Sequence, residues 1–109
     1  MKKVLNLVVT KKWFEMIVSS AKNEEYREIK TYWIKRLTTN CEFVHEVWVE
    51  MKCGKVLYRP YTHVLFSAGY SKDRPSIEKE IEYITIGMPK KGLCPDKWLN
   101  QRFFIIKFK

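Results

Sequence analysis

The chain has 109 residues, a length that supports one domain with a single modest hydrophobic core. Apolar residues make up 46% of it and aromatic residues 15%, which excludes a disordered chain, and no apolar run approaches the roughly 20 residues of a membrane span. Lys and Arg number 21 against 12 Asp and Glu, and the resulting net charge of +9 favours an anionic partner.

The positive charge is concentrated at the two ends of the chain. The formal charge is +5 over residues 1–40, −1 over residues 41–88 and +5 over residues 89–109. If the two ends form neighbouring strands of one sheet, they create a single basic face suited to a polyanion such as RNA. Lysines that only keep a small domain soluble would give the same composition, so both interpretations stay open.

The cysteines and histidines do not favour a metal site. Cys41, Cys53 and Cys94 form no CxxC pair, and an odd number of thiols suits the reducing cytoplasm. Cys41 and His45 lie four apart and could share a helix face, but zinc needs about four ligands and His63 is the one other histidine. We therefore expect a cytoplasmic protein without a metal, a cofactor or a membrane anchor.

The first elements are a strand and an amphipathic helix. Val4 to Val9 alternate with the period of a strand, and Asn6 and the following lysines make this stretch unlike a secretory signal. Thr10 can cap a helix that runs through Ser20. The helical spacing of its apolar residues predicts a buried stripe at Trp13, Phe14, Ile17 and Val18.

A second strand over Glu24 to Ile29 carries charged residues where a buried strand would be apolar. Its alternation places Glu25, Arg27 and Ile29 on one face, with Lys22 just before it at the turn. Residues two apart on a strand lie roughly 6.5 to 7 Å apart, so Glu25 and Arg27 can clasp one polar ligand. A solvated edge strand with incidental ion pairs explains the spacing equally well.

Tyr32 to Thr38 predicts a short helix with Trp33 and Leu37 facing inward. Its outward residues are Tyr32, Lys35 and Arg36, which combine a stacking surface with cationic groups. This combination suits a nucleobase and its phosphate, and it also suits an ordinary surface helix.

Cys41 to Gly54 predicts a further helix, which Gly54 would end. Its acidic residues recur every four positions on the side opposite its apolar residues, and they would repel phosphate, so we exclude this segment from the binding surface. The apolar side comprises Phe43, Val44, Val47, Trp48 and Met51, and the acidic side Glu42, Glu46 and Glu50.

The rest of the chain predicts extended structure. Val56 to Tyr58 and Tyr61 to Phe66 are separated by Pro60, and the Ser67–Pro75 loop contains Gly69, which can take positive φ. Further strands are expected at 77–87, with Glu78, Glu80 and Glu82 on one face, and at 103–109, joined by a loop at 89–95. The pattern gives an α+β fold of five or six strands with two or three helices packed against them.

Ser20-x-Lys22-x-x-Glu25-x-Arg27 resembles the GxKxxExR signature of the ASCH domain, part of the PUA-like superfamily. The motif follows a strand and a helix containing Trp13-Phe14, as in that family, and the later stretches His63–Tyr70, Ile81–Gly87 and Phe103–Phe108 resemble its other strands. The resemblance implies one domain over 1–109, a small, mostly antiparallel β-barrel, with 39–58 as an insertion or a divergent segment.

The resemblance also implies a cleft for RNA or a nucleotide-like ligand. Lys22 and Arg27 would contact phosphate or base oxygens, and Glu25 would act as acceptor or orienter. Ser20 replaces the family's glycine, and serine would be strained there if the position needs positive φ. The full set of expected ligand-binding residues is Lys22, Glu25, Arg27, Tyr32, Trp33, Arg36, Gly69 and Tyr70.

Three functions follow, of which the first is favoured. The first is a non-catalytic RNA- or nucleotide-binding module. The second is a hydrolase of modified nucleosides or a ribonuclease using Lys22 and Glu25, since some ASCH-like proteins act on acetylated cytidine or on RNA. The family members that act on acetylated cytidine are amidohydrolases, and they carry a threonine where Glu25 stands. A lysine beside a carboxylate also tends to stay protonated, which suits anion binding better than nucleophilic attack. The third is a protein-interaction domain whose basic surface only solubilises it.

Overall fold

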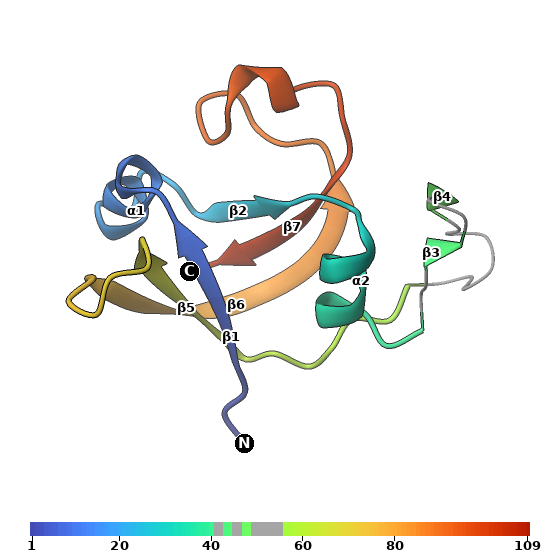
Figure 1. Cartoon of the computed structure of the whole chain (residues 1–109), viewed down its shortest axis with the longest axis horizontal. Coiled ribbons are helices and arrows are strands. Elements are labelled where there is room, and N and C mark those ends of the chain that lie inside the picture. Colours follow the sequence, from blue (N-terminus) through green and yellow to red (C-terminus); the bar gives the residue numbers. More distant parts are fainter. Residues whose placement is uncertain (41–42, 45–46, 49–55) are drawn as a thin grey trace.

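Five strands form one mixed sheet in the order β1-β5-β6-β7-β2, with two α-helices beside it, in this computed structural model (Figure 1). The structure describes residues 1–40, 43–44, 47–48 and 56–109. The α+β class expected from the sequence is confirmed. The strands of the sheet are β1 (Val4–Val9), β2 (Glu24–Arg27), β5 (His63–Ala68), β6 (Ser76–Gly87) and β7 (Phe103–Phe108), and the helices are α1 (Lys11–Val18), α2 (Thr31–Leu37) and the short 3₁₀ helix η1 (Asp96–Trp98).

The sheet is open, and β1 and β2 are its two edges. β1 pairs with β5 in parallel, and every other neighbouring pair is antiparallel. No ladder joins β1 to β2 in the described part of the chain, so the expected barrel is not confirmed. A side chain connects the edges instead: Arg27 Nη2 on β2 donates to the Val8 carbonyl on β1 at 2.9 Å.

The main core lies between the sheet and the two helices. β1 contributes alternate residues, as its period of two predicts, and α1 contributes Phe14 and Ile17. α2 contributes Ile34 and Leu37, whereas Trp33 is half-buried. Burial of these faces against one another supplies the main driving force for folding. The buried members of this cluster are Leu5, Leu7, Val9, Phe14, Ile17, Ile34, Leu37, Val64, Phe66, Phe104, Ile106 and Phe108.

A second, smaller core explains why β7 is buried on both faces. Residues 88–102, which join β6 to β7 and contain η1, form a loop that we call the 88–102 loop (Figure 1). Cys94 of this loop is buried with Tyr26, Phe103 and Ile105, and Trp98 stacks on Phe103 with ring centroids 4.7 Å apart. The loop therefore covers the face of β2 and β7 opposite the main core.

The first helix differs from the prediction at its end. α1 ends at Val18, which is 49% exposed, so its assignment to the buried stripe is wrong. Thr10 occupies the N-cap position without a side-chain capping hydrogen bond. The buried side of α1 comprises Phe14 and Ile17, and the chain leaves the helix through Ser20 at φ 66°.

The helix predicted over Cys41 to Gly54 is wrong where the structure describes it. Phe43–Val44 (β3) and Val47–Trp48 (β4) form a two-stranded antiparallel ladder. Two apolar pairs separated by two residues fit helical spacing, but β-branched and aromatic residues also favour strands, and that tendency prevails here. The remainder of the segment lies outside the described residues, including Cys41 and His45.

The later elements follow the sequence more closely. β6 covers the strand expected at 77–87, with Glu78, Glu80 and Glu82 exposed, and β7 matches the final strand. Gly69 has φ +81°, as its place in the loop requires. No helix in the described residues is long and apolar enough to cross a membrane.

Candidate functional site

A pocket of about 830 Å³ opens between the two sheet edges, α2 and the 88–102 loop. Seven of the eight residues expected to bind a ligand line it: Lys22, Glu25, Arg27, Tyr32, Trp33, Arg36 and Tyr70. Gly69 does not line it; its N–H donates to the Val9 carbonyl at 3.1 Å and its turn brings Tyr70 to the rim. The fold therefore brings these residues together on one pocket from three stretches of the chain, 22–27, 32–36 and the loop that contains Tyr70.

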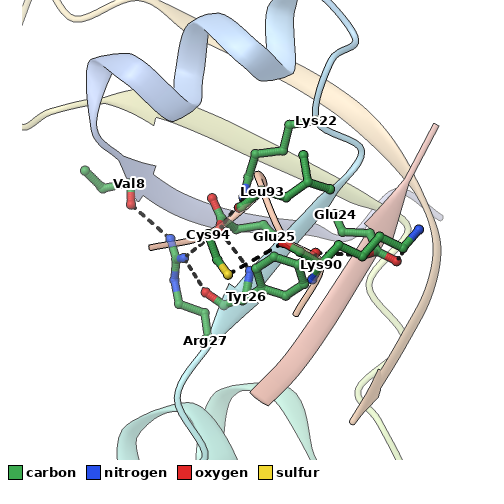
Figure 2. Close-up of polar contacts among 9 residues, drawn as sticks. All are labelled: Val8, Lys22, Glu24, Glu25, Tyr26, Arg27, Lys90, Leu93 and Cys94. Atoms are coloured by element: carbon green, nitrogen blue, oxygen red, sulfur yellow. Dashed lines mark hydrogen bonds and ion pairs between the residues drawn. The ribbon is translucent and has the colours of Figure 1, made fainter. Parts of the chain in front are cut away.

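Lys22 reaches the floor of the pocket because the chain turns sharply after α1. Positive φ at Ser20 reverses the chain, and the Lys22 N–H donates to the Met16 carbonyl at 3.0 Å. The side chain is 1% exposed. Its ammonium group donates to the Leu93 carbonyl and lies 3.5 Å from Glu25 Oε1 (Figure 2). Lys22 is therefore held by the 88–102 loop as well as by β2.

Two aromatic rings complete the environment of the Lys22 ammonium group. Its Nζ lies 4.8 Å from the centre of the Trp13 ring and 4.9 Å from that of the Tyr26 ring. Ring faces attract a cation, most strongly where water is excluded. The rings and the Glu25 carboxylate together offset part of the cost of burying the charge.

Glu25 presents its two carboxylate oxygens differently. Oε1 accepts the Tyr26 N–H at 2.9 Å and lies 3.5 Å from both Lys22 Nζ and Arg27 Nη1. Oε2 is buried and has no hydrogen-bond partner among the described residues. Glu25 is therefore fixed by one oxygen and leaves the other as an unused acceptor in the pocket wall.

Arg27 spans the gap between the sheet edges. Nη1 donates to the Tyr26 carbonyl at 2.8 Å and Nη2 to the Val8 carbonyl at 2.9 Å (Figure 2). The guanidinium group also lies 5.2 Å from the centre of the Trp33 ring. Arg27 is thus a structural bridge as well as a member of the pocket wall.

The other face of β2 holds the 88–102 loop. Tyr26 donates its hydroxyl to Glu24 Oε2 at 2.8 Å and accepts the Lys90 N–H at 3.2 Å, while Lys90 Nζ lies 3.7 Å from Glu24 Oε1. Glu24 and Glu25 are 5% and 4% exposed, so the interpretation of β2 as a solvated strand is wrong. The covering loop supplies partners to Glu24, Tyr26 and the preceding Lys22, which the alternation alone does not reveal.

α2 places an aromatic and cationic group at the rim. Arg36 Nη1 donates to the Tyr32 hydroxyl at 2.9 Å, and the guanidinium lies 5.4 Å from the Tyr32 ring and 5.5 Å from the Trp33 ring. Arg36 Nε is buried without a hydrogen-bond partner among the described residues. Tyr32 is 55% exposed, so this group faces the entrance rather than the floor.

Burial shifts the pKa values of two side chains that line the pocket, Lys22 and Cys94. Burial lowers the pKa of the Lys22 ammonium below its usual value, against the opposing effect of the Glu25 carboxylate. Lys22 therefore loses its proton more readily than its pairing with the Glu25 carboxylate alone would imply. Burial also raises the pKa of the Cys94 thiol, although the nearby Lys22 charge opposes it. The raised pKa favours the protonated thiol, which is a weaker nucleophile than the thiolate.

Sequence reasoning missed part of the wall. The sequence places Trp13 in the core, and Trp13 does pack against the core, but it is half-buried and also lines the pocket. The sequence predicts no role for the 88–102 loop, although Leu93, Cys94 and Trp98 all line the pocket. The apolar residues in an otherwise polar loop were the available signal, because apolar loop residues usually pack against something.

The described residues contain no group of three or more His, Cys, Asp or Glu side chains placed to hold a metal ion. Comparison of the chain with protein-family models, curated proteins and solved structures finds no match. The resemblance to the ASCH domain therefore depends only on the motif and the sequence stretches named above.

Proposed function

We propose that the chain is an ASCH/PUA-like module that binds single-stranded RNA, or a nucleotide-like ligand, in this pocket without catalysing a reaction. The observation that carries the proposal is the convergence of aromatic walls and cations from α1, β2, α2 and the 88–102 loop on one pocket. In this proposal the open sheet corresponds to a barrel whose seam between β1 and β2 is bridged by the Arg27 side chain.

The aromatic walls suit an unpaired base. Trp13, Tyr32, Trp33 and Trp98 all line the pocket, and its volume of about 830 Å³ lies within the range of ~300 to 1,000 Å³ typical of small-ligand sites. Stacking of a base on an aromatic side chain contributes about 1–3 kcal/mol and tolerates any base. A base in the pocket would therefore gain affinity before any hydrogen bond is counted.

The cations divide between floor and rim. The Lys22 ammonium group is already engaged by the Leu93 carbonyl and Glu25, and Arg27 donates to two backbone carbonyls. Arg36 lies at the rim beside the exposed Tyr32, and its buried Nε has no hydrogen-bond partner among the described residues. We therefore assign the phosphate contact to Arg36. Lys22 and Arg27 instead hold the floor of the pocket in place through their contacts within the protein.

Replacing Arg36 tests the proposal on the protein side. Arg36→Ala is expected to weaken binding of a short single-stranded RNA by roughly five- to tenfold, because it removes one phosphate contact and the cation beside Tyr32. The slope of log affinity against log salt should fall in magnitude by about 0.7. Fluorescence anisotropy at several salt concentrations measures both.

Lys35→Ala is the matched control. Lys35 is the preceding residue on the same helix, has the same charge and is exposed, but it does not line the pocket. Equal losses of affinity in the two variants would reduce the binding to general attraction by a basic surface and contradict the proposal. A partner that stays bound through nuclease treatment and high salt would favour the protein-interaction function instead.

A hydrolase on the same pocket is the second candidate, and the lowered pKa of Lys22 favours it. A neutral lysine amine can act as a base or a nucleophile. The hydrolase function requires product from acetylated cytidine or from RNA that disappears in Lys22→Ala, whereas the binding function requires no turnover.

A further inference from the structure

Two buried side-chain polar atoms in the described residues lack a hydrogen-bond partner, and both belong to residues that line the pocket. They are Glu25 Oε2 and Arg36 Nε. A buried polar atom without a partner is costly, and it calls for an explanation such as a ligand. Glu25 Oε2 is an acceptor and Arg36 Nε is a donor, so a ligand that satisfies both atoms must carry a hydrogen-bond donor and a hydrogen-bond acceptor.

The chemistry of Glu25 Oε2 constrains the ligand. Oε1 of Glu25 is already occupied by the Tyr26 N–H and faces the Lys22 and Arg27 cations, so Oε2 is the acceptor left for a ligand (Figure 2). A carboxylate only accepts hydrogen bonds. A phosphate near it would place like charges together, so the group that meets Oε2 must be an N–H or O–H donor.

The surrounding side chains identify the donor as part of a flat ring. Trp13, Trp33 and Trp98 line the pocket with Glu25, so the donor must fit a site with several aromatic rings. Nucleobases combine a flat ring with N–H donors along their Watson–Crick edge. In paired RNA this edge is occupied, so an unpaired base is required.

We propose that the pocket takes one unpaired nucleobase whose Watson–Crick N–H donates to Glu25 Oε2, while its phosphate stays at Arg36 on the rim. This inference deepens the function proposed above and rests on it. It makes Glu25 the residue that selects the ligand, and it makes Lys22 and Arg27 the groups that fix Glu25 in position.

Paired RNA probes test the inference without changing the protein. Oligoadenylate is compared with the same oligomer built from purine ribonucleotides, which lack the exocyclic amine and have no base N–H. Oligocytidylate is compared in the same way with an oligomer of pyrimidin-2-one ribonucleotides. Each pair has the same phosphates and nearly the same stacking surface, so only the hydrogen-bond donor differs.

We expect the oligomers without the amine to bind at least about tenfold more weakly to the native chain, measured by fluorescence anisotropy at fixed salt. Glu25→Gln should reduce that preference, because the amide no longer offers a charged acceptor. Arg36→Ala should weaken both members of a pair by the same factor, since its contact is with phosphate. If Glu25→Gln does not fold, the comparison on the native chain still decides the question.

The outcomes separate the two proposals. Equal affinity for both members of each pair overturns the role of Glu25 and leaves RNA binding in the pocket standing. An undiminished preference in folded Glu25→Gln also overturns the role of Glu25. No binding of any oligomer at low salt overturns RNA binding itself, and the inference with it.

Discussion

Lys22 is as deeply buried as the apolar core, at 1% exposed, and its contacts explain how a charged residue is tolerated there. The Leu93 carbonyl accepts from its ammonium group, Glu25 supplies the opposite charge, and two rings face it. Breaking a buried ion pair by removing one partner costs about 3–5 kcal/mol, far more than an exposed pair. The three charged motif residues therefore act as one unit.

Ser20, at the turn before Lys22, lowers the free energy of unfolding by an amount that can be measured. Ser20 has φ 66°, a conformation that costs a residue with a Cβ about 1–2 kcal/mol, while glycine adds about 0.5–1 kcal/mol of unfolded-state entropy. We expect Ser20→Gly to raise the free energy of unfolding by about 0.5–1 kcal/mol, because the relieved strain exceeds the added entropy. Chemical denaturation of the two proteins measures the difference.

Ser19 is the matched control for this prediction. It precedes Ser20, has φ −79° and donates its hydroxyl to the Met16 carbonyl at 3.2 Å. Ser19→Gly should lower stability by about 0.5–1 kcal/mol, since no strain is relieved and a hydrogen bond is lost. The same sign of change in both variants would contradict the argument.

Among the elements, the strand–helix–strand–helix succession at the start of the chain could be predicted from periodicity. β2 alternates as expected: Glu25 and Arg27 line the pocket, and Tyr26 joins the core beneath the 88–102 loop. Lys22, Glu25 and Arg27 lie close together in the sequence, so the spacing of the motif was enough to predict that they share one site. The helix predicted over Cys41 to Gly54 failed because apolar spacing over a few residues fits strands equally well.

The 88–102 loop could not be predicted as a wall of the pocket. Its contacts with β2 and the preceding turn join residues about 70 positions apart, for example the Lys22 ammonium group and the Leu93 carbonyl. Backbone acceptors carry no sequence signal, and the same is true of the Val8 carbonyl that receives Arg27. Such contacts depend on tertiary packing rather than on the local pattern.

The attachment of this loop to β2 should depend on pH through Tyr26. Burial raises the pKa of the Tyr26 hydroxyl above its ordinary value of 10.0, with the Glu24 carboxylate acting in the same direction. The folded state therefore keeps a proton that the unfolded state loses above pH 10. The resulting stabilisation is complete below pH 10 and declines by about 1.4 kcal/mol per pH unit above it.

Tyr26→Phe isolates this effect from the other alkaline titrations, including those of Lys22 and Cys94. At pH 8 the variant should be less stable by about 1–3 kcal/mol, because Glu24 Oε2 loses its donor. The stability difference from the native chain should then shrink as pH rises from 10 to 11. Urea denaturation across this range measures it, and a constant difference would exclude a role for Tyr26 ionisation.

At the scale of the whole molecule, the fold joins the two basic ends of the chain. β2, from the first basic segment, pairs with β7, from the last, as expected if the ends are neighbouring strands. Lys107 on β7 stands opposite the buried Glu24. Exposed acidic residues of the neighbouring β6 pair with lysines from both ends: Lys2 Nζ lies 2.7 Å from Glu78 Oε2, and Lys109 Nζ lies 3.2 Å from Glu80 Oε1. Part of the positive charge of the two ends is therefore neutralised at β6.

The most direct test of the central claim is an NMR titration of the ¹⁵N-labelled chain with a short single-stranded RNA. Binding in the pocket predicts that the largest amide shifts fall at Lys22 to Arg27, in the first turn of α2 and at Leu93 to Trp98, with little change at Glu78 to Glu82. Largest shifts on the outer face of β6, or no shifts at saturating RNA and low salt, would contradict it.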